Sequence, residues 1–336
     1  MIASGEEVTV ARFVVIGSNS FSGSHFVDYL LERGEQVLGI SRSPEPHAVF
    51  LPYTRHPEGF RFHQLDLNHD LDAILEVIEA AQSPYVVNFA AQSMVGQSWQ
   101  HPEHWFQTNV VSTVELHDRL RSLPFLERYV HISTPEVYGS CEGLVGEDAP
   151  FNPSTPYAVS RAAADMSLET FRANYGFPVV YTRAANVFGP GQQLYRIVPR
   201  AALCALVGET LELHGGGHSV RSFIHIRDVA EGTYLAATQG QPGSVYHLST
   251  DRHISIRQVV EAVLAELGAD FDQVVKVVDD RPGKDAAYLL DSSRAKRELG
   301  WEPKLSFEDG VRDVVSWMRE NLDAIREQPR AYVHKP

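Results

Sequence analysis

Apolar runs alternate with amphipathic segments through the first half of the chain. Runs rich in β-branched side chains predict buried strands, and segments with apolar residues on one side predict helices. Strands are expected at 11–16, 36–40, 61–65, 85–90, 129–133 and 178–183, and helices at 25–32, 71–81, 102–120 and 158–175. This alternation is typical of βαβ units and predicts an α/β fold with a doubly wound parallel sheet.

A turn rich in small residues joins the first predicted strand to the first helix. Gly17 and Gly23 bracket this turn, and between them lie Asn19, Ser20, Phe21 and Ser22. Glycine lets the backbone approach a pyrophosphate closely, and the start of a helix offers free N–H groups and the positive end of its dipole. The turn indicates a dinucleotide site, although two glycines also occur in ordinary tight turns.

The residues after the second and third strands indicate which dinucleotide binds. An acid after the second strand would hold the ribose 2′-hydroxyl of NAD, but this sequence has Ser41 followed by Arg42. Because an arginine can pair with a 2′-phosphate, the sequence favours NADP, with NAD as the alternative. Asp66 and Leu67 follow the third strand, where they are expected to contact the adenine. Asp66 is equally compatible with a helix N-cap.

Polar residues suited to acid–base chemistry follow the fifth predicted strand. Thr134 and Glu136 lie there, and Tyr157 begins the next helix. Arg161, four residues after Tyr157, shares its helix face. A fixed positive charge beside a phenol favours the phenolate, which makes Tyr157 a better base. These residues lie at the edge where open parallel sheets bind ligands.

The alternation of strands and helices breaks up after about residue 184. Loops rich in glycine and proline, such as 189–191 and 215–217, separate shorter elements there. We expect residues 1–11 to be a tail, residues 12–183 to form the dinucleotide-binding domain, and the chain to return to that domain around 220–250. The rest of 184–336 is expected to form a smaller substrate-binding domain.

Composition and charge narrow the class of protein further. The 336 residues include 43 Asp and Glu against 29 Lys and Arg, a formal net charge of −14, which argues against binding a nucleic-acid backbone. No apolar run is long enough to span a membrane, and residues 1–10 carry two glutamates without Lys or Arg, unlike a signal peptide. The two cysteines cannot form a disulfide framework, so we expect a cytoplasmic protein with reduced thiols.

A series of motifs gives the chain a resemblance to a known family. The motifs are Gly17 with Gly23, NFAAQS at 88–93, TPEVYG at 134–139, PYAVSR at 156–161, NVFGP at 186–190, RSFIHIRD at 221–228, RPGKD at 281–285 and LGW at 299–301. In this order they resemble the extended short-chain dehydrogenase/reductases that act on nucleotide sugars, over residues 12–318. Glu136, the pair Gln92–Ser93 and the stretch 39–43 look most like GDP-mannose 4,6-dehydratases, which use NADP. The resemblance implies a Rossmann-like fold and a homodimer through a four-helix bundle built from 102–120 and 158–175.

The resemblance also implies a mechanism. Tyr157 would take the proton of the sugar C4 hydroxyl, which Thr134 also contacts, while a hydride passes from C4 to the nicotinamide. Glu136 would remove the C5 proton, water would leave from C6, and the hydride would return to C6. Besides the glycine turn, the cofactor would contact Ser41, Arg42, Asp66, Leu67, Ala90, Ala91, Gln92, Tyr157 and Arg161. The nucleotide sugar would contact Ser93, Thr134, Pro135, Glu136, Asn186, Arg196, Arg221 and Arg281.

Three residues depart from the family pattern. Ser20 replaces a glycine and brings a hydroxyl that can donate to a phosphate. Arg161 replaces a lysine, so its planar guanidinium is expected to displace contacts to the cofactor ribose. Pro135 replaces the Asp that many 4,6-dehydratases use as the acid for the C6 hydroxyl; water, protonated Glu136 or Tyr138 would take its place.

These departures leave three functions open. The first is 4,6-dehydration of a nucleotide sugar, the second is another nucleotide-sugar reaction (4-epimerisation, reduction or 5,6-elimination), and the third is binding without turnover. No metal is expected, because His214, His218 and His225 lack the spacing of a zinc site.

Overall fold

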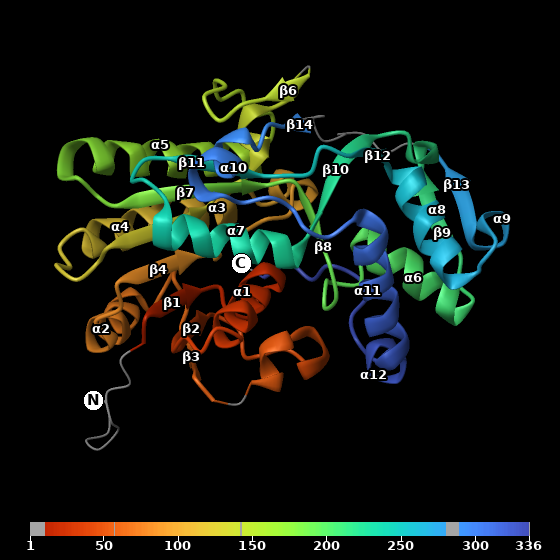
Figure 1. Cartoon of the computed structure of the whole chain (residues 1–336), viewed down its shortest axis with the longest axis horizontal. Helices are drawn as coiled ribbons and strands as arrows, with labels where there is room; N and C mark the ends of the chain where they lie inside the picture. The colour runs from red at the N-terminus through yellow and green to blue at the C-terminus, as the bar shows by residue number, and fades with distance from the viewer. Residues whose placement is uncertain (1–10, 57, 142, 280–288, 336) are drawn as a thin grey trace.

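A computed structural model describes residues 11–56, 58–141, 143–279 and 289–335. Its main sheet has seven strands in the order β11-β7-β5-β4-β1-β2-β3, and every neighbouring pair is parallel. The strands are β1 (Phe13–Ile16), β2 (Val37–Ser41), β3 (Phe60–Gln64), β4 (Tyr85–Asn88), β5 (Arg128–Ile132), β7 (Val179–Ala184) and β11 (Val245–Leu248). The predicted parallel α/β sheet is confirmed, and Figure 1 shows it on the left of the molecule.

Helices cover both faces of this sheet. Because successive side chains of a strand point to opposite faces, a strand with a fully apolar sequence serves two cores. In β1, Phe13 and Val15 pack with α1 (Phe21–Leu31) and α7 (Ile226–Gln239), whereas Val14 and Ile16 pack on the other face. That second face is covered by α2 (Leu71–Ala81), α4 (Thr113–Leu120) and α5 (Pro156–Tyr175).

The long helix predicted at 102–120 is continuous but changes its winding. It begins as α3 (Pro102–Phe106), passes through a π-helical segment (Gln107–Ser112) and continues as α4. Thr108, Asn109 and Ser112 of the π segment are buried. A π segment re-aims side chains and often lies at a functional site.

The second half of the chain forms a smaller body beside the sheet, on the right in Figure 1. Its core lies between α6 (Ile197–Val207), α8 (Ile256–Leu267) and α11 (Phe307–Glu320). Its other elements are β8 (Asn186–Phe188), β9 (Leu211–His214), β10 (Val220–His225), β12 (His253–Ser255), α9 (Phe271–Val274), β13 (Val275–Val278) and α12 (Leu322–Arg326). Within the region 220–250, β11 joins the main sheet. The predicted domain limits remain predictions.

Shorter elements complete the described chain. The strands β6 (Leu144–Val145) and β14 (Leu289–Leu290) pair with each other, and α10 (Ser293–Leu299) packs against α7. Short 3₁₀ helices lie at Ala48–Phe50, Pro52–Arg55, Gly96–Trp99, Pro135–Tyr138 and Gly215–Gly217. Among the described residues, no helix has the length and apolar character needed to cross a membrane.

Candidate functional site

The turn between β1 and α1 needs both of its glycines. Gly17 has φ +84°, and a Cβ there would lie 2.7 Å from the backbone nitrogen of Ala90. A Cβ at Gly23 would lie 2.1 Å from the carbonyl oxygen of Gly17. Side chains at these positions would therefore force the turn away from β4 and from the start of α1. This close packing brings the backbone to the place where a pyrophosphate meets a helix N-terminus.

Ser20 has a structural role in this turn. Its Oγ accepts a hydrogen bond from the backbone N–H of Gly23 at 3.1 Å and donates to the carbonyl oxygen of Gly17 at 2.7 Å. Ser20 is thus the N-cap of α1, and the helix starts at Phe21, earlier than the predicted 25. The hydroxyl proton goes to Gly17, so the expected donation to a phosphate does not fit this geometry.

A cavity of about 150 Å³ lies at the carboxyl ends of β1 to β4. The predicted cofactor residues that line it are Gly17, Asn19, Ser20, Ser41, Arg42, Asp66, Leu67, Ala90, Ala91 and Gln92. The cavity and the glycine cradle beside it fit a nicotinamide dinucleotide. Of the remaining predicted residues, Phe21, Ser22 and Gly23 form the first turn of α1.

Two predicted cofactor residues organise the loops around this cavity. Asn19 donates from Nδ2 to the carbonyl oxygen of Ser43 at 2.8 Å, which ties the glycine turn to the loop after β2. Asp66 Oδ1 accepts from the backbone N–H of Asn68 at 2.9 Å. The N-cap of α2 is Asp70, so the alternative role of Asp66 as a helix cap is wrong.

The predicted catalytic residues gather where β5 ends and α5 begins. Thr134 caps the 3₁₀ helix Pro135–Tyr138, and its Oγ1 accepts from the backbone N–H of Glu136 at 3.2 Å. Pro135 takes the first helical position, where its missing N–H costs nothing. Glu136 is 8% exposed and Tyr157 is 9% exposed. The carboxylate of Glu136, the hydroxyl of Thr134 and the phenol of Tyr157 therefore lie in one site that is largely shielded from solvent.

Tyr157 lies in the first turn of α5, which is fixed by its cap. Thr155 Oγ1 accepts from the backbone N–H of Ala158 at 3.1 Å. Burial raises the pKa of Tyr157, while the positive charge of Arg161 and a hydrogen bond with Thr134 lower it. The nearby Glu136 raises the same pKa. Arg161 and Thr134 thus favour the phenolate form that a general base needs.

Arg161 is anchored on strand β5. Its side chain is buried, and Nη2 contacts the carbonyl oxygen of Ile132 and lies 3.2 Å from Nε2 of His131. Burial and the charge of Arg161 hold the pKa of His131 well below its usual range, so His131 is a neutral acceptor. Part of the Arg161 guanidinium therefore bonds to strand β5. This is a physical reason for the prediction that Arg161 displaces contacts to the cofactor ribose.

Tyr138 does not fit the role of acid for the C6 hydroxyl. It is 1% exposed, and its hydroxyl lies 2.8 Å from Nε2 of His247 and contacts Arg183. Burial raises its pKa to about 12. Since its proton is enclosed in this buried network, the prediction for Tyr138 was wrong.

The other predicted substrate residues come from both halves of the fold. Asn186 on β8 pairs with Phe223 on β10, so Arg221, two residues before Phe223, shares its face of the sheet. Arg196 is exposed, and its charge lowers the pKa of Tyr157. Ser93 is exposed in the loop after β4. Arg281 lies outside the described residues.

Sequence reasoning missed Asn109, which holds the loop after β4. This residue of the π segment is fully buried, accepts from the backbone N–H of Gln92 at 2.8 Å and donates to its carbonyl oxygen at 3.0 Å. Nδ2 also donates to Ser160 Oγ at 3.0 Å. The sequence signal was a polar Asn inside the helix predicted at 102–120.

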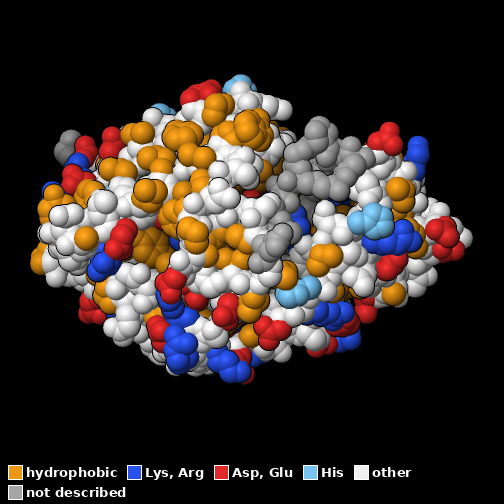
Figure 2. Space-filling view, turned by 90° about the horizontal axis from the view of Figure 1, so that it is seen from above, with side chains coloured by type: hydrophobic (Ala, Val, Ile, Leu, Met, Phe, Trp, Pro, Cys, Tyr) orange, Lys and Arg blue, Asp and Glu red, His pale blue; other side chains and the backbone are white. Residues whose placement is uncertain are grey.

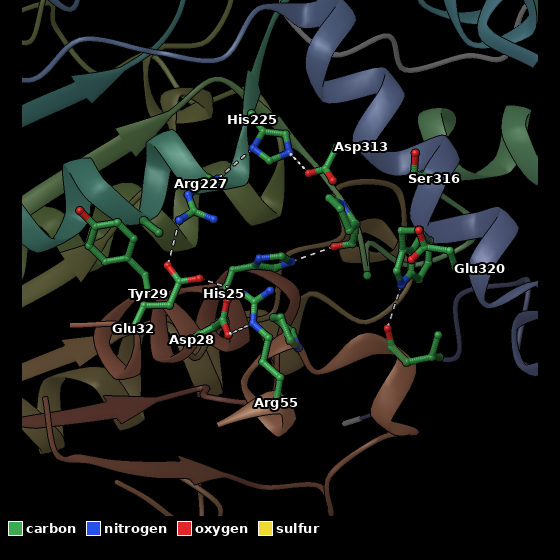
Figure 3. A pocket seen from close by; sticks show the side chains of 16 residues that line it. His25, Asp28, Tyr29, Glu32, Arg55, His225, Arg227, Asp313, Ser316 and Glu320 are labelled. Carbon is green, nitrogen blue, oxygen red and sulfur yellow. Dashed lines mark hydrogen bonds and ion pairs between the residues drawn. The ribbon is translucent and has the colours of Figure 1, made fainter. Parts of the chain in front are cut away.

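A larger cavity of about 360 Å³ lies away from the catalytic residues, between α1, α7 and α11. Figure 3 shows that its charged groups face one another: Arg55 contacts Asp28 and Glu32, and His225 lies 3.2 Å from Asp313. No residue of the predicted site lines it. Its lining carries four carboxylates against two arginines, and none of these groups belongs to the site around Tyr157.

Two groups of side chains in the described part of the chain have the composition of metal ligands: His101, Glu103 and His104, and Asp28, Glu32 and His56. Neither includes a predicted catalytic residue or the histidines at 214, 218 and 225. Arg55 pairs with Asp28 and Glu32, and Arg227 also pairs with Glu32.

Comparison with known proteins agrees with this geometry. A family profile described as GDP-mannose 4,6 dehydratase matches residues 14–314. The dTDP-glucose 4,6-dehydratase of Xanthomonas campestris is 32% identical over 332 residues, covering 93% of this chain and 94% of that protein. The low-salt glycan biosynthesis protein Agl12 of Haloferax volcanii is 33% identical, covering 90% and 97%.

Solved structures extend the likeness to three dimensions. DesIV, a dTDP-glucose 4,6-dehydratase from Streptomyces venezuelae crystallised with NAD, has a TM-score of 0.86 and 32% identity, covering 93% of this chain and 98% of that one. UDP-glucose 4-epimerase from Thermotoga maritima has a TM-score of 0.84 and 27% identity, covering 92% and 99%. The chain belongs to the GDP-mannose 4,6-dehydratase family of extended short-chain dehydrogenase/reductases.

Proposed function

We propose that this protein is a nucleotide-sugar 4,6-dehydratase. The observation that carries the proposal is the buried carboxylate of Glu136, which lies in the same site as Tyr157 and Thr134. An exchange of hydride at C4 alone needs only the phenol and the hydroxyl. A second base in the same site suits a reaction that also removes a proton from carbon.

The roles of the chain's residues follow from their chemistry. Tyr157, as phenolate, accepts the proton of the C4 hydroxyl while Thr134 orients that hydroxyl. A nicotinamide dinucleotide, when bound, supplies the hydride acceptor for C4 and the hydride donor for C6. Because a C4 ketone acidifies the neighbouring C–H bond, Glu136 can then remove the C5 proton, and hydroxide leaves C6 as water.

The acid that protonates the departing C6 hydroxyl is Glu136 itself. Pro135 has no proton to give, and the hydroxyl of Tyr138 is enclosed by His247 and Arg183. Once Glu136 has taken the C5 proton, its carboxylic acid can donate that proton to the hydroxyl leaving the adjacent carbon, C6. Atoms and electrons balance: one water leaves, the hydride removed from C4 ends at C6, and C5 regains a proton from solvent while the C4 hydroxyl proton leaves through Tyr157.

We further propose NADP as the preferred dinucleotide, with the reaction taking place in the cytoplasm. Ser41 and Arg42 stand where an acid would select NAD, and an arginine pairs well with a 2′-phosphate. Neither Cys141 nor Cys204 forms a disulfide, which suits a reducing compartment.

An isologous homodimer completes the proposal. Phe106 and Val111 on the α3–α4 helix and Val159 and Met166 on α5 are exposed apolar residues. Figure 2 shows apolar side chains gathered over the part of the molecule that carries α5. Two copies packed through these helices would bury this face in a four-helix bundle.

The reaction is tested with a panel of GDP-, dTDP-, UDP- and CDP-hexoses, followed by mass spectrometry. The proposal expects one nucleotide sugar to lose a single water and become a 4-keto-6-deoxy sugar. The alternative, 4-epimerisation, is favoured by the likeness to UDP-glucose 4-epimerase. It would give a product of unchanged mass that separates from its substrate on chromatography.

A further inference from the structure

The chain after α12 crosses from the smaller body to the dinucleotide cavity. Arg330 pairs with Glu209, which follows α6, at 2.6 Å, and the ring of Tyr332 lies edge-on to Tyr195 with centroids 5.8 Å apart. Figure 1 marks the C-terminal end near the middle of the molecule, well away from α12. We call residues 330–335 the C-terminal strap.

An aromatic seat on α3 holds the strap. The ring of His334 stacks on the buried Trp105 with centroids 5.1 Å apart and an interplanar angle of 11°. His334 Nε2 lies 2.8 Å from Nδ1 of His104, and its Nδ1 lies 3.2 Å from the hydroxyl of Tyr332. Both ring nitrogens and one ring face are thus in contact, which fixes the residue before Lys335.

The backbone of Lys335 joins the two walls of the dinucleotide cavity. Its carbonyl oxygen accepts from Nε2 of Gln92 at 2.7 Å and from Nη2 of Arg42 at 3.2 Å. Gln92 follows β4 and Arg42 follows β2, and both line the cavity. The strap therefore bridges the two sides of the cavity at its rim, outside the residues that line the cavity itself.

The side chain of Lys335 brings a second cation to the end of β2. Its Nζ donates to the hydroxyl of Ser43 at 3.0 Å, and Ser43 follows Arg42 and also lines the cavity. Because a serine hydroxyl is neutral, this contact leaves the ammonium charge in place. A phosphate monoester carries a charge of about −1.5 to −2 at pH 7, which two adjacent cations match better than one.

We propose that the C-terminal strap is a wall of the dinucleotide site and that Lys335 acts with Arg42 to recognise the 2′-phosphate of NADP. The proposal rests on the dinucleotide site of the proposed function, but not on the reaction performed there. An arginine carries five N–H donors, so Arg42 can hold the Lys335 carbonyl and a phosphate oxygen together. Lys335 is then a specificity-determining residue supplied by a distant part of the sequence.

The test is isothermal titration calorimetry, which measures the Kd of NADP⁺ and of NAD⁺ for the cofactor-free protein. Lys335→Gln removes the charge and keeps a side chain that can reach Ser43. It is expected to weaken NADP⁺ binding about 10-fold, the effect of losing one hydrogen bond to a charged group, and to change the Kd of NAD⁺ less than twofold. Lys296→Gln, an exposed lysine paired with Glu302, is the matched control and should change neither Kd.

A second variant tests the enclosure separately from the charge. His334→Ala keeps Lys335 but removes the aromatic seat, so NADP⁺ and NAD⁺ should both dissociate faster in stopped-flow displacement. Equal weakening of both dinucleotides by Lys335→Gln, or no weakening, would overturn the role in 2′-phosphate recognition. Unchanged dissociation in His334→Ala would overturn the strap as a wall. Because these are binding measurements, they are independent of whether any sugar is dehydrated.

Discussion

The charge of Arg161 governs the protonation of Tyr157. Burial raises the pKa of the phenol and Arg161 opposes that rise, so Arg161→Met raises the pKa further. Below this pKa the phenolate fraction falls about tenfold per pH unit, so the limb of the pH–rate profile that rises with pH moves to higher pH. Turnover near pH 7 is expected to fall about 10-fold for each unit of that shift.

The matched variant for this prediction is Arg161→Lys, which keeps the charge. It should leave the position of the rising limb close to that of the unchanged protein, with a lower plateau because the contact with the Ile132 carbonyl is altered. A profile for Arg161→Met that coincides with that of the unchanged protein would show that Arg161 has only a packing role.

Residues that lie in a short sequence motif could be located from the sequence. Surroundings that depend on distant strands could not. Glu136, Tyr157 and the glycines lie in short local patterns, and the structure brings them to one edge of the sheet. Tyr138 belongs to the same local pattern but is enclosed by Arg183 and His247, which come from distant strands. The spacing of residues in the sequence does not show that Tyr138 is buried by these distant residues.

The π segment of the α3–α4 helix makes Asn109 the support of the loop after β4. Asn109→Ala would leave the buried backbone N–H and carbonyl of Gln92 without partners. We expect a loss of about 2–3 kcal/mol in the free energy of unfolding, measured by denaturant titration. Asn174→Ala, on the exposed face of α5, should cost less than about 0.5 kcal/mol. Equal losses in the two variants would refute the supporting role.

The C-terminal strap should loosen in acid. Burial and the neighbouring charges of His104, His101 and Arg42 lower the pKa of His334 below 6.5, and Glu103 opposes this. The docked strap therefore holds His334 neutral, and docking is favoured above pH 6.5 and weakens as the pH falls through the lowered value. Cofactor dissociation, followed by stopped-flow, should speed up between pH 7.5 and pH 5.5, on the order of a few-fold.

The control for the acid response is His334→Phe. Phenylalanine keeps the stacking on Trp105 but has no proton to gain. Its cofactor dissociation should lack the acceleration assigned to His334. An equal acceleration in both proteins would place the titrating group elsewhere in the site.

Elements of the first half were predictable because each carries its own pattern. The helix at Leu71–Ala81 was predicted at its observed bounds, and the sheet strands shifted by one or two residues. The second half was not divided into elements, because its strands are short and pair over long separations. Asn186–Phe188, for example, pairs with the end of Val220–His225. Such pairing depends on the path of the chain rather than on local periodicity.

For the whole molecule, the apolar face on α5 predicts assembly in pairs. In an isologous dimer each Met166, which is 60% exposed, would meet the same surface of a second copy. Met166→Glu would place like charges in that contact, so light scattering after gel filtration should report a monomer. Met166→Leu should remain a dimer. A dimer unaffected by Met166→Glu would place the interface on another surface.

The central claim is that Glu136 removes a proton from C5 during dehydration. The most direct measurement is turnover of the accepted nucleotide sugar in deuterated water, with mass spectrometry and NMR of the product. The account predicts that the product has lost one water and gained one deuterium at C5. For Glu136→Gln it predicts neither change, although oxidation at C4 still reduces the cofactor. A product without deuterium at C5, or unchanged turnover by Glu136→Gln, would contradict it.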